Sequence, residues 1–248
     1  MSARLKETLK PFIPETVLKR WRLMRFNSEQ AAARGRPLDE VFNDIYQRGI
    51  WRPEGSDAVF HSGPGSMPGV TRGYEEFVAD YINANPDIAT LVDIGCGDFQ
   101  VSQRILERLA RPVSYVGCDI ASVVVADNER RHGVPGRIEF RQLNVATGDL
   151  PEGDIVTIRE VFQHLSNDTI LAALANLRKA GFKRGIITEA IARDPSAPNL
   201  DIISGYRTRD GLNSGVYLDL APFSLPVLGR YDVDVGHAEV LRTLIVEL

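Results

Sequence analysis

The chain is poor in cysteine and contains no long apolar run. Its 248 residues include two cysteines, Cys96 and Cys118, and both fall at the ends of predicted strands. We therefore expect small buried thiols rather than a disulfide framework, which is typical of a reducing cytoplasm. No segment approaches the roughly 20 apolar residues of a membrane-spanning helix. Charged residues and prolines interrupt the apolar residues of positions 1–25, so we expect neither a signal peptide nor a membrane span.

Basic residues are fewer than acidic residues outside the first fifth of the chain. Residues 1–52 hold 11 Lys and Arg against 6 Asp and Glu, whereas the remainder holds 18 against 27. An acidic body is a poor platform for nucleic acid, so we expect no such partner. The basic head suits weak contact with an anionic surface or, alternatively, an amphipathic helix packed on its own domain. The residues of the basic head that carry this contact are Lys19, Arg20, Trp21, Arg22 and Arg25. The oligomeric state is left open.

The periodicity of the chain predicts two parts. Residues 1–87 form an N-terminal helical extension with a helix over 38–50, a Gly/Pro/Ser-rich loop over 51–70 and a helix that ends near Asn85. From residue 88 onward, short apolar runs alternate with helical patterns. Strands are predicted over 90–94, 114–118, 137–142, 154–158 and 185–190, and helices over 101–111, 123–131 and 168–180.

This alternation predicts the α/β class with a doubly wound, Rossmann-like sheet of seven mostly parallel strands. The last two strands, over 227–233 and 238–246, are separated by the turn residues 234–237 and are expected to form a C-terminal antiparallel hairpin. We therefore expect one main domain over 88–248, interrupted by an insertion at about 194–225 that is too long for an ordinary connection.

A glycine-rich turn follows the first predicted strand. The stretch Asp93-Ile94-Gly95-Cys96-Gly97-Asp98 leads from the strand into a helix, so backbone N–H groups are expected to face a polar ligand there. The third glycine of a dinucleotide fingerprint is missing, and the negative charge of Asp98 disfavours a pyrophosphate. A tight turn without a ligand is the alternative.

The turn resembles the first motif of class I S-adenosylmethionine-dependent methyltransferases. The resemblance implies a cofactor site at the carboxyl ends of the strands. Asp119 follows the second strand and is expected to accept both ribose hydroxyls, or else to cap the next helix. Asn144 follows the third strand and suits the adenine, although a turn-forming Asn looks the same and the family more often has Asp here. The full set of expected cofactor residues is Ser66, Asp93, Gly95, Cys96, Gly97, Asp119, Ile120, Asn144, Val145 and Arg159.

The fourth strand is followed by His164, in a segment that is similar to the fourth motif of many small-molecule methyltransferases. A neutral imidazole at the rim is suited to removing the proton of an attacking hydroxyl, although a rim histidine also serves simply to hold a loop. Glu160 and Glu189 lie at strand ends and are expected to orient His164 or bind hydroxyls. Carboxylates and a histidine also suit Mg²⁺, but no spacing motif supports a metal, and metal dependence is left open.

The insertion mixes planar donors, carboxylates and aromatic side chains, as carbohydrate sites do. We expect it to bind the acceptor, unless it is only a surface flap packed by its aromatic residues. The expected acceptor residues are Tyr206, Arg207, Asp219 and Phe223. The upstream loop over 62–66, with Trp51 before it, is expected to cover the amino acid end of the cofactor, because its glycines let N–H groups approach a carboxylate.

The motifs over residues 40–248 together resemble bacterial class I methyltransferases of glycan and polysaccharide synthesis, including the mycobacterial methylmannose polysaccharide type. The resemblance implies O-methylation of a sugar or oligosaccharide hydroxyl. Methylation of a phenolic or other secondary metabolite is the nearest alternative. Alternatives from other classes are an NAD-dependent oxidoreductase, which would share the turn and Asp119, and a non-catalytic cofactor-binding protein.

Overall fold

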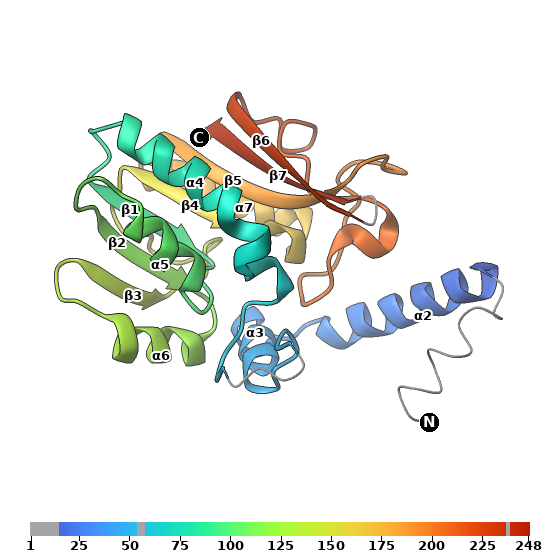
Figure 1. Ribbon diagram of the computed structural model, residues 1–248. Coiled ribbons are helices and arrows are strands. Elements are labelled where there is room, and N and C mark those ends of the chain that lie inside the picture. Colours follow the sequence, from blue (N-terminus) through green and yellow to red (C-terminus); the bar gives the residue numbers. More distant parts are fainter. Residues whose placement is uncertain (1–14, 54–57, 237–238) are drawn as a thin grey trace.

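A seven-stranded sheet forms the centre of the molecule (Figure 1). The computed structural model describes residues 15–53, 58–236 and 239–248, apart from several side chains of the first helix. The strand order is β3-β2-β1-β4-β5-β7-β6. Strand β7 runs antiparallel to both of its neighbours, β5 and β6, and the other neighbouring pairs are parallel. The strands are β1 Thr90–Ile94, β2 Ser114–Asp119, β3 Ile138–Gln142, β4 Ile155–Arg159, β5 Arg184–Ala192, β6 Val227–Gly236 and β7 Glu239–Glu247.

This topology confirms the predicted fold class, the doubly wound sheet and the antiparallel hairpin. Part of the predicted hairpin turn, residues 237–238, lies outside the described residues. The helices are α2 Glu15–Ala33, α3 Leu38–Gln47, α4 Pro68–Ala84, α5 Gln100–Glu107, α6 Ser122–His132 and α7 Asn167–Lys179. The described residues also contain the short 3₁₀ helices η2 Pro64–Ser66, η3 Phe162–His164 and η4 Arg209–Leu212, which the periodicity did not predict.

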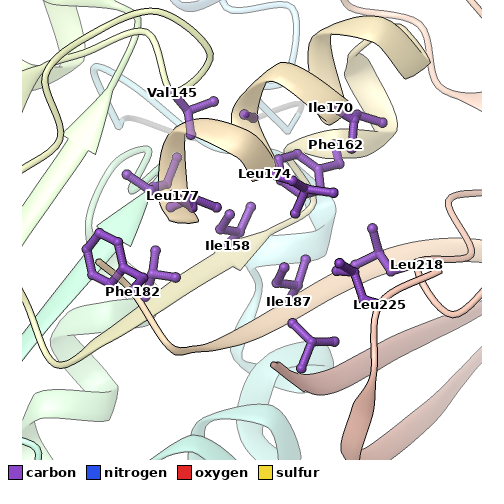
Figure 2. Close-up of a cluster of buried hydrophobic side chains, with 14 of the residues drawn as sticks. Val145, Ile158, Phe162, Ile170, Leu174, Leu177, Phe182, Ile187, Leu218 and Leu225 are labelled. Atoms are coloured by element: carbon purple, nitrogen blue, oxygen red, sulfur yellow. The ribbon is translucent and has the colours of Figure 1, made fainter. Parts of the chain in front are cut away.

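The central strands are apolar on both faces because helices cover both sides of the sheet. In β1, Leu91 points into the core formed with α4, α5 and α6, whereas Val92 and Ile94 point into the core formed with α7. Figure 2 shows the second core, in which α7 packs over β4 and β5 and the insertion supplies further apolar side chains. Those side chains are Val216, Leu218, Phe223 and Leu225.

Helix α7 begins and ends where its sequence predicts. The Ser166 hydroxyl accepts a hydrogen bond from the Thr169 N–H and caps the helix. Gly181 follows the helix at a φ of 91°, in the left-handed region that favours glycine. The start of α7 is therefore secured directly after the short segment that carries His164.

The two N-terminal helices lie at the edge of the sheet where the parallel strands end (Figure 1). Helix α2 contacts the insertion: Gln30 accepts a hydrogen bond from the Ile203 N–H, and Glu29 pairs with Arg207. Helix α3 packs on α6 through a separate apolar cluster. The first helix thus supports the insertion. The side chains of Lys19, Trp21, Arg22 and Arg25, which carry the predicted anionic-surface contact, lie outside the described part.

Candidate active site

A cavity of about 310 Å³ opens at the carboxyl ends of β1, β2 and β4. Its walls come from the glycine turn after β1, the residues that follow β2, β3 and β4, the loop over 62–66, helix α3 and the insertion. This is the position at which open α/β sheets bind their ligands. The expected cofactor residues Ser66, Asp93, Gly95, Cys96, Gly97, Asp119, Ile120, Asn144, Val145 and Arg159 all line it.

The glycine turn is shaped by close contacts that exclude side chains. Gly95 has a φ of 73°, and a Cβ built on it would lie 2.2 Å from Val161 Cγ2. Gly97 has a φ of 54°, and its Cβ would lie 2.1 Å from the Ser62 hydroxyl oxygen. Glycine is thus required at both positions by conformation and by space. The turn brings backbone N–H groups to the cavity wall, as a polar ligand needs.

Two buried aspartates support the turn. The Asp93 carboxylate accepts hydrogen bonds from the hydroxyls of Ser102, Tyr115 and Thr157 at 2.6, 2.8 and 2.9 Å. The Asp119 carboxylate accepts from the N–H groups of Gly97 and Ala121 at 3.0 and 2.9 Å. Burial raises the pKa of both carboxyl groups, that of Asp119 to about 6. Asp119 is therefore tied to the glycine turn as well as to the start of α6.

The loop over 62–66 closes one end of the cavity. The Ser62 hydroxyl bonds the Asp98 carboxylate at 3.0 Å and accepts from the Asp98 N–H at 2.8 Å. Arg159 reaches across to donate to the Gly65 carbonyl at 2.9 Å and lies 5.2 Å above the Tyr74 ring. The loop is thereby held against both the glycine turn and the end of β4.

Polar atoms without partners gather in this cavity. Three buried side-chain atoms of residues lining it have no partner among the described residues: Arg159 Nε, Gln163 Oε1 and His164 Nδ1. Glu160 pairs with Arg159 at 2.7 Å and has a φ of 56°, a conformation that non-glycine residues adopt at a cost. Unsatisfied polar atoms are costly in a protein interior. Their clustering indicates a polar ligand.

His164 lies in η3 among aromatic rings. Its ring centroid is 5.4 Å from that of Trp51 and 6.1 Å from that of Phe42. The side chain is buried, and this burial lowers the pKa of the imidazole to about 4. His164 is therefore neutral at pH 7, with Nδ1 free of a hydrogen-bond partner.

Asn144 and Cys96 occupy other walls of the cavity. The Asn144 side-chain oxygen accepts from the Ala146 N–H at 3.0 Å, so Asn144 also shapes the turn after β3. The thiol of Cys96 faces the cavity, and burial raises its pKa well above the ordinary value. Such a thiol stays protonated and acts as a small apolar wall.

Of the four expected acceptor residues, only Tyr206 lines the cavity. Arg207 turns away to pair with Glu29 on α2. Asp219 is exposed, whereas Phe223 is buried in the core beneath α7. The insertion is therefore mostly a packed cover, and its aromatic content reflects core packing as much as a binding surface.

Glu189 also lies outside the cavity lining. Its carboxylate accepts hydrogen bonds from the N–H groups of Phe162 and Gln163 at 2.9 and 2.8 Å. Burial raises its pKa to about 8. Glu189 thus contacts the backbone that carries His164, whereas Glu160 lines the cavity.

Several lining residues were not assigned to the site from the sequence. Phe42 and Tyr46 are four residues apart on α3, a spacing that places both on the buried face toward the cavity. This spacing of four residues is the sequence signal that could have identified Phe42 and Tyr46 as lining residues. The other unassigned lining residues are Leu38, Tyr74, Val101, Ser102, Leu143, Val161, Gln163, Leu165, Thr169 and Thr208.

The described residues contain no group of three or more His, Cys, Asp or Glu side chains suited to a metal ion. Among the helices that the structure describes, none combines the length and the apolar composition of a membrane span.

Comparison with known proteins points to one family. Residues 92–187 match the family model described as a methyltransferase domain. No protein with a curated description is similar enough in sequence to match the chain. The matched segment begins within β1, ends within β5, and includes the glycine turn, Asp119 and His164.

Solved structures share the fold at low sequence identity. Magnesium protoporphyrin IX methyltransferase from Synechocystis PCC 6803 with bound SAM is 14% identical, covers 86% of this chain and 99% of its own, and has a TM-score of 0.56. The cyclase SpnF is 15% identical, with 85% and 97% covered and a TM-score of 0.59. The N-methyltransferase NodS from Bradyrhizobium japonicum WM9 is 13% identical, with 82% and 98% covered and a TM-score of 0.55. Such likeness shows a shared fold, which hosts different chemistries.

Proposed function

We propose that this S-adenosylmethionine-dependent methyltransferase of the class I fold methylates a hydroxyl of a sugar or oligosaccharide, with His164 as the general base. The observation that carries the proposal is the neutral, buried imidazole of His164 on the same cavity as the glycine turn. The family match makes the NAD-dependent alternative unnecessary. The acceptor assignment draws on the sequence resemblance and on the mixed aromatic and polar wall beside His164.

The donors and acceptors of the cavity fit the cofactor. In this proposal Asp119 accepts the ribose hydroxyls, and Asn144, Ile120 and Val145, which line the same cavity, contact the adenine. Arg159 suits the carboxylate of the amino acid end, because its Nε lacks a partner. When bound, the cofactor supplies a methyl group whose C–S bond breaks as the acceptor oxygen forms the new C–O bond.

His164 accepts the proton that the acceptor hydroxyl gives up. Burial keeps the imidazole neutral and ready to accept it, although a pKa of about 4 makes it a weaker base than an exposed histidine. The rings of Trp51 and Phe42 beside it exclude water and hold the imidazole plane. Positioning therefore carries much of the catalysis in this proposal.

The acceptor wall beside His164 combines Phe42, Trp51 and Tyr206 with Thr208 and Thr169. Aromatic faces stack on the apolar face of a sugar ring, and the threonine hydroxyls supply hydrogen-bond partners. The same rings also favour a phenolic acceptor, which is the second candidate. The mixed wall favours a sugar because a phenol needs few hydroxyl partners.

The test is binding followed by turnover. Calorimetric titration with S-adenosylmethionine, its demethylated product and NAD is expected to give micromolar binding of the first two alone. Methyl transfer from the radiolabelled cofactor is then measured with mono- and oligosaccharides, matched deoxy or O-methyl sugars, and simple phenols. Transfer to a sugar that stops when one hydroxyl is blocked supports the proposal. Transfer to phenols alone replaces it with the second candidate.

Cofactor affinity is expected to depend on pH through Asp119. The folded protein holds this carboxyl with a raised pKa of about 6, and only its ionised form accepts both ribose hydroxyls. Affinity should therefore fall roughly tenfold as pH drops from 7 to 5. Calorimetry across this range checks the effect. Asp119→Asn should bind weakly with a flat pH profile. Asp127→Asn, which changes an acid on α6 that pairs with Arg130, should retain the wild-type profile.

A further inference from the structure

The segment that carries His164 is too short to hold itself. The 3₁₀ helix η3 spans three residues, and its own support is limited to bonds from the His164 and Leu165 N–H groups to the Val161 and Phe162 carbonyls, both 3.0 Å long. Short 3₁₀ segments have poor hydrogen-bond geometry. The Gly205 N–H donates to the His164 carbonyl at 2.9 Å, and two buried side chains from distant parts of the chain bind the other backbone groups.

Glu189 holds η3 from the side of β5. Its carboxylate is 1% exposed and accepts from the Phe162 and Gln163 N–H groups. These are the backbone donors at the start of the short helix. Each of its two oxygens accepts one backbone N–H, so this single side chain fixes both donors.

Arg209 holds the same segment from the insertion. Its guanidinium is fully used: Nη1 donates to the carbonyls of Phe162 and Gln163 at 3.2 and 3.3 Å, and Nη2 donates to the Leu165 carbonyl at 2.7 Å. The two remaining N–H groups bind Asn167 Oδ1 and the Leu200 carbonyl, both at 2.8 Å. Arg209 is 1% exposed. Only a guanidinium presents five donors in this planar arrangement.

The two side chains have complementary hydrogen-bonding roles on one turn. Burying a charge is expensive unless it is fully hydrogen-bonded. The Glu189 carboxylate binds backbone donors, whereas the Arg209 guanidinium binds backbone acceptors, so neither side chain can replace the other. Arg209 also lies in η4, on the segment that carries Tyr206 and Thr208 to the cavity. The turn of His164 is therefore attached directly to the acceptor side.

We propose that Arg209, together with Glu189, is a positioning residue that holds the His164 backbone in its catalytic place and links it to the acceptor-binding insertion. This inference rests on His164 as the base of the proposed function. Neither side chain lines the cavity, so each acts through the turn rather than on the substrate.

Arg209→Lys tests the role because it keeps the charge and removes the planar set of donors. We expect kcat to fall by roughly tenfold to a hundredfold while cofactor affinity changes by less than about twofold. The titration midpoint of the His164 imidazole, followed by NMR in the protein without acceptor, should shift, because a looser turn changes both the hydration of the ring and its hydrogen bonds to the backbone of Gly205 and Tyr206. The charged groups beside it, Asp210 and position 209, keep their charges in this variant.

Two further variants complete the experiment. Glu189→Gln removes one backbone bond acceptor and should give the same pattern with a smaller loss, which keeps the test available if Arg209→Lys folds poorly. Arg193→Lys, in an exposed pair with Asp234, should leave kcat and the His164 titration unchanged. Unchanged kcat and titration in both Arg209→Lys and Glu189→Gln would overturn the proposal. The titration needs no acceptor, so the two proposals can fail separately. If Arg209→Lys alters the His164 titration while His164→Ala keeps full activity, His164 is not the general base, but Arg209 still positions its turn.

Discussion

Replacing His164 with alanine is expected to reduce turnover at least about a hundredfold while cofactor affinity stays within about twofold of wild type. In the proposed mechanism the imidazole removes the proton of the acceptor hydroxyl, whereas Asp119 and the glycine turn hold the cofactor. Steady-state kinetics and calorimetry measure the two effects separately. His132→Ala, which removes a partly exposed imidazole on α6, provides the matched control and should keep full turnover.

The pH profile gives a second test of the same residue. Because burial lowers the His164 pKa to about 4, the imidazole stays neutral from pH 8 down to about pH 5. Turnover at saturating cofactor should therefore stay level over this range and fall only in more acidic solution. A decline centred near pH 6.5 would mean that His164 is solvated, and unchanged turnover in His164→Ala would remove its catalytic role.

Gly95→Ala is expected to abolish measurable cofactor binding, with a loss of at least about a hundredfold in affinity. Two costs act together: a φ of 73°, and a methyl group placed 2.2 Å from Val161 Cγ2 on the cavity wall. The conformational cost for a non-glycine residue is about 1–2 kcal/mol. The clash displaces either the turn or Val161, and both line the site. Calorimetry and thermal unfolding measure the two consequences.

The chain offers controls that separate strain from collision. Gly136 has a φ of 72° with nothing within 4 Å of the added Cβ, so Gly136→Ala should lower stability by the conformational cost alone and leave cofactor affinity unchanged. Val161→Ala removes the colliding methyl, because Val161 Cβ lies at 3.5 Å, and should restore part of the affinity in the Gly95→Ala background. Wild-type binding by Gly95→Ala itself would contradict the importance of this contact.

The residues expected to bind the cofactor line one cavity, as the sequence predicted, because their placement follows a general rule. Strand β1 has the bounds expected from its apolar residues, and polar residues at the ends of β1 to β4 converge on one edge because parallel strands end together. Bounds that depend on tertiary contacts were less accurate: α5 ends at Glu107 rather than near residue 111. The match to a methyltransferase domain confirms the activity expected from the glycine turn.

The insertion was harder to predict because composition does not tell which way a side chain points. Phe223 has the aromatic character of a sugar platform, yet it is buried among Leu218 and Leu225. Arg209 gave no signal because a buried guanidinium has no sequence pattern. Its role depends on five partners, and four of them lie in residues 162–167, far from Arg209 in the chain. Long-range contacts of this kind emerge only from the folded molecule.

The two halves of the cavity have different origins in the chain. The glycine turn, Asp119, Asn144 and His164 lie within the segment that matches the methyltransferase family, whereas Phe42, Trp51, Tyr206 and Thr208 lie outside it. The division is not complete, because Thr169 of the proposed acceptor wall lies inside the matched segment and Ser66 of the expected cofactor set lies outside it. In the proposed function, a change of acceptor therefore needs changes mainly outside the matched segment. Exchanging α3 and the insertion between related chains, with α2 retained as the support of the insertion, is a modular route to new acceptors on an unchanged catalytic base.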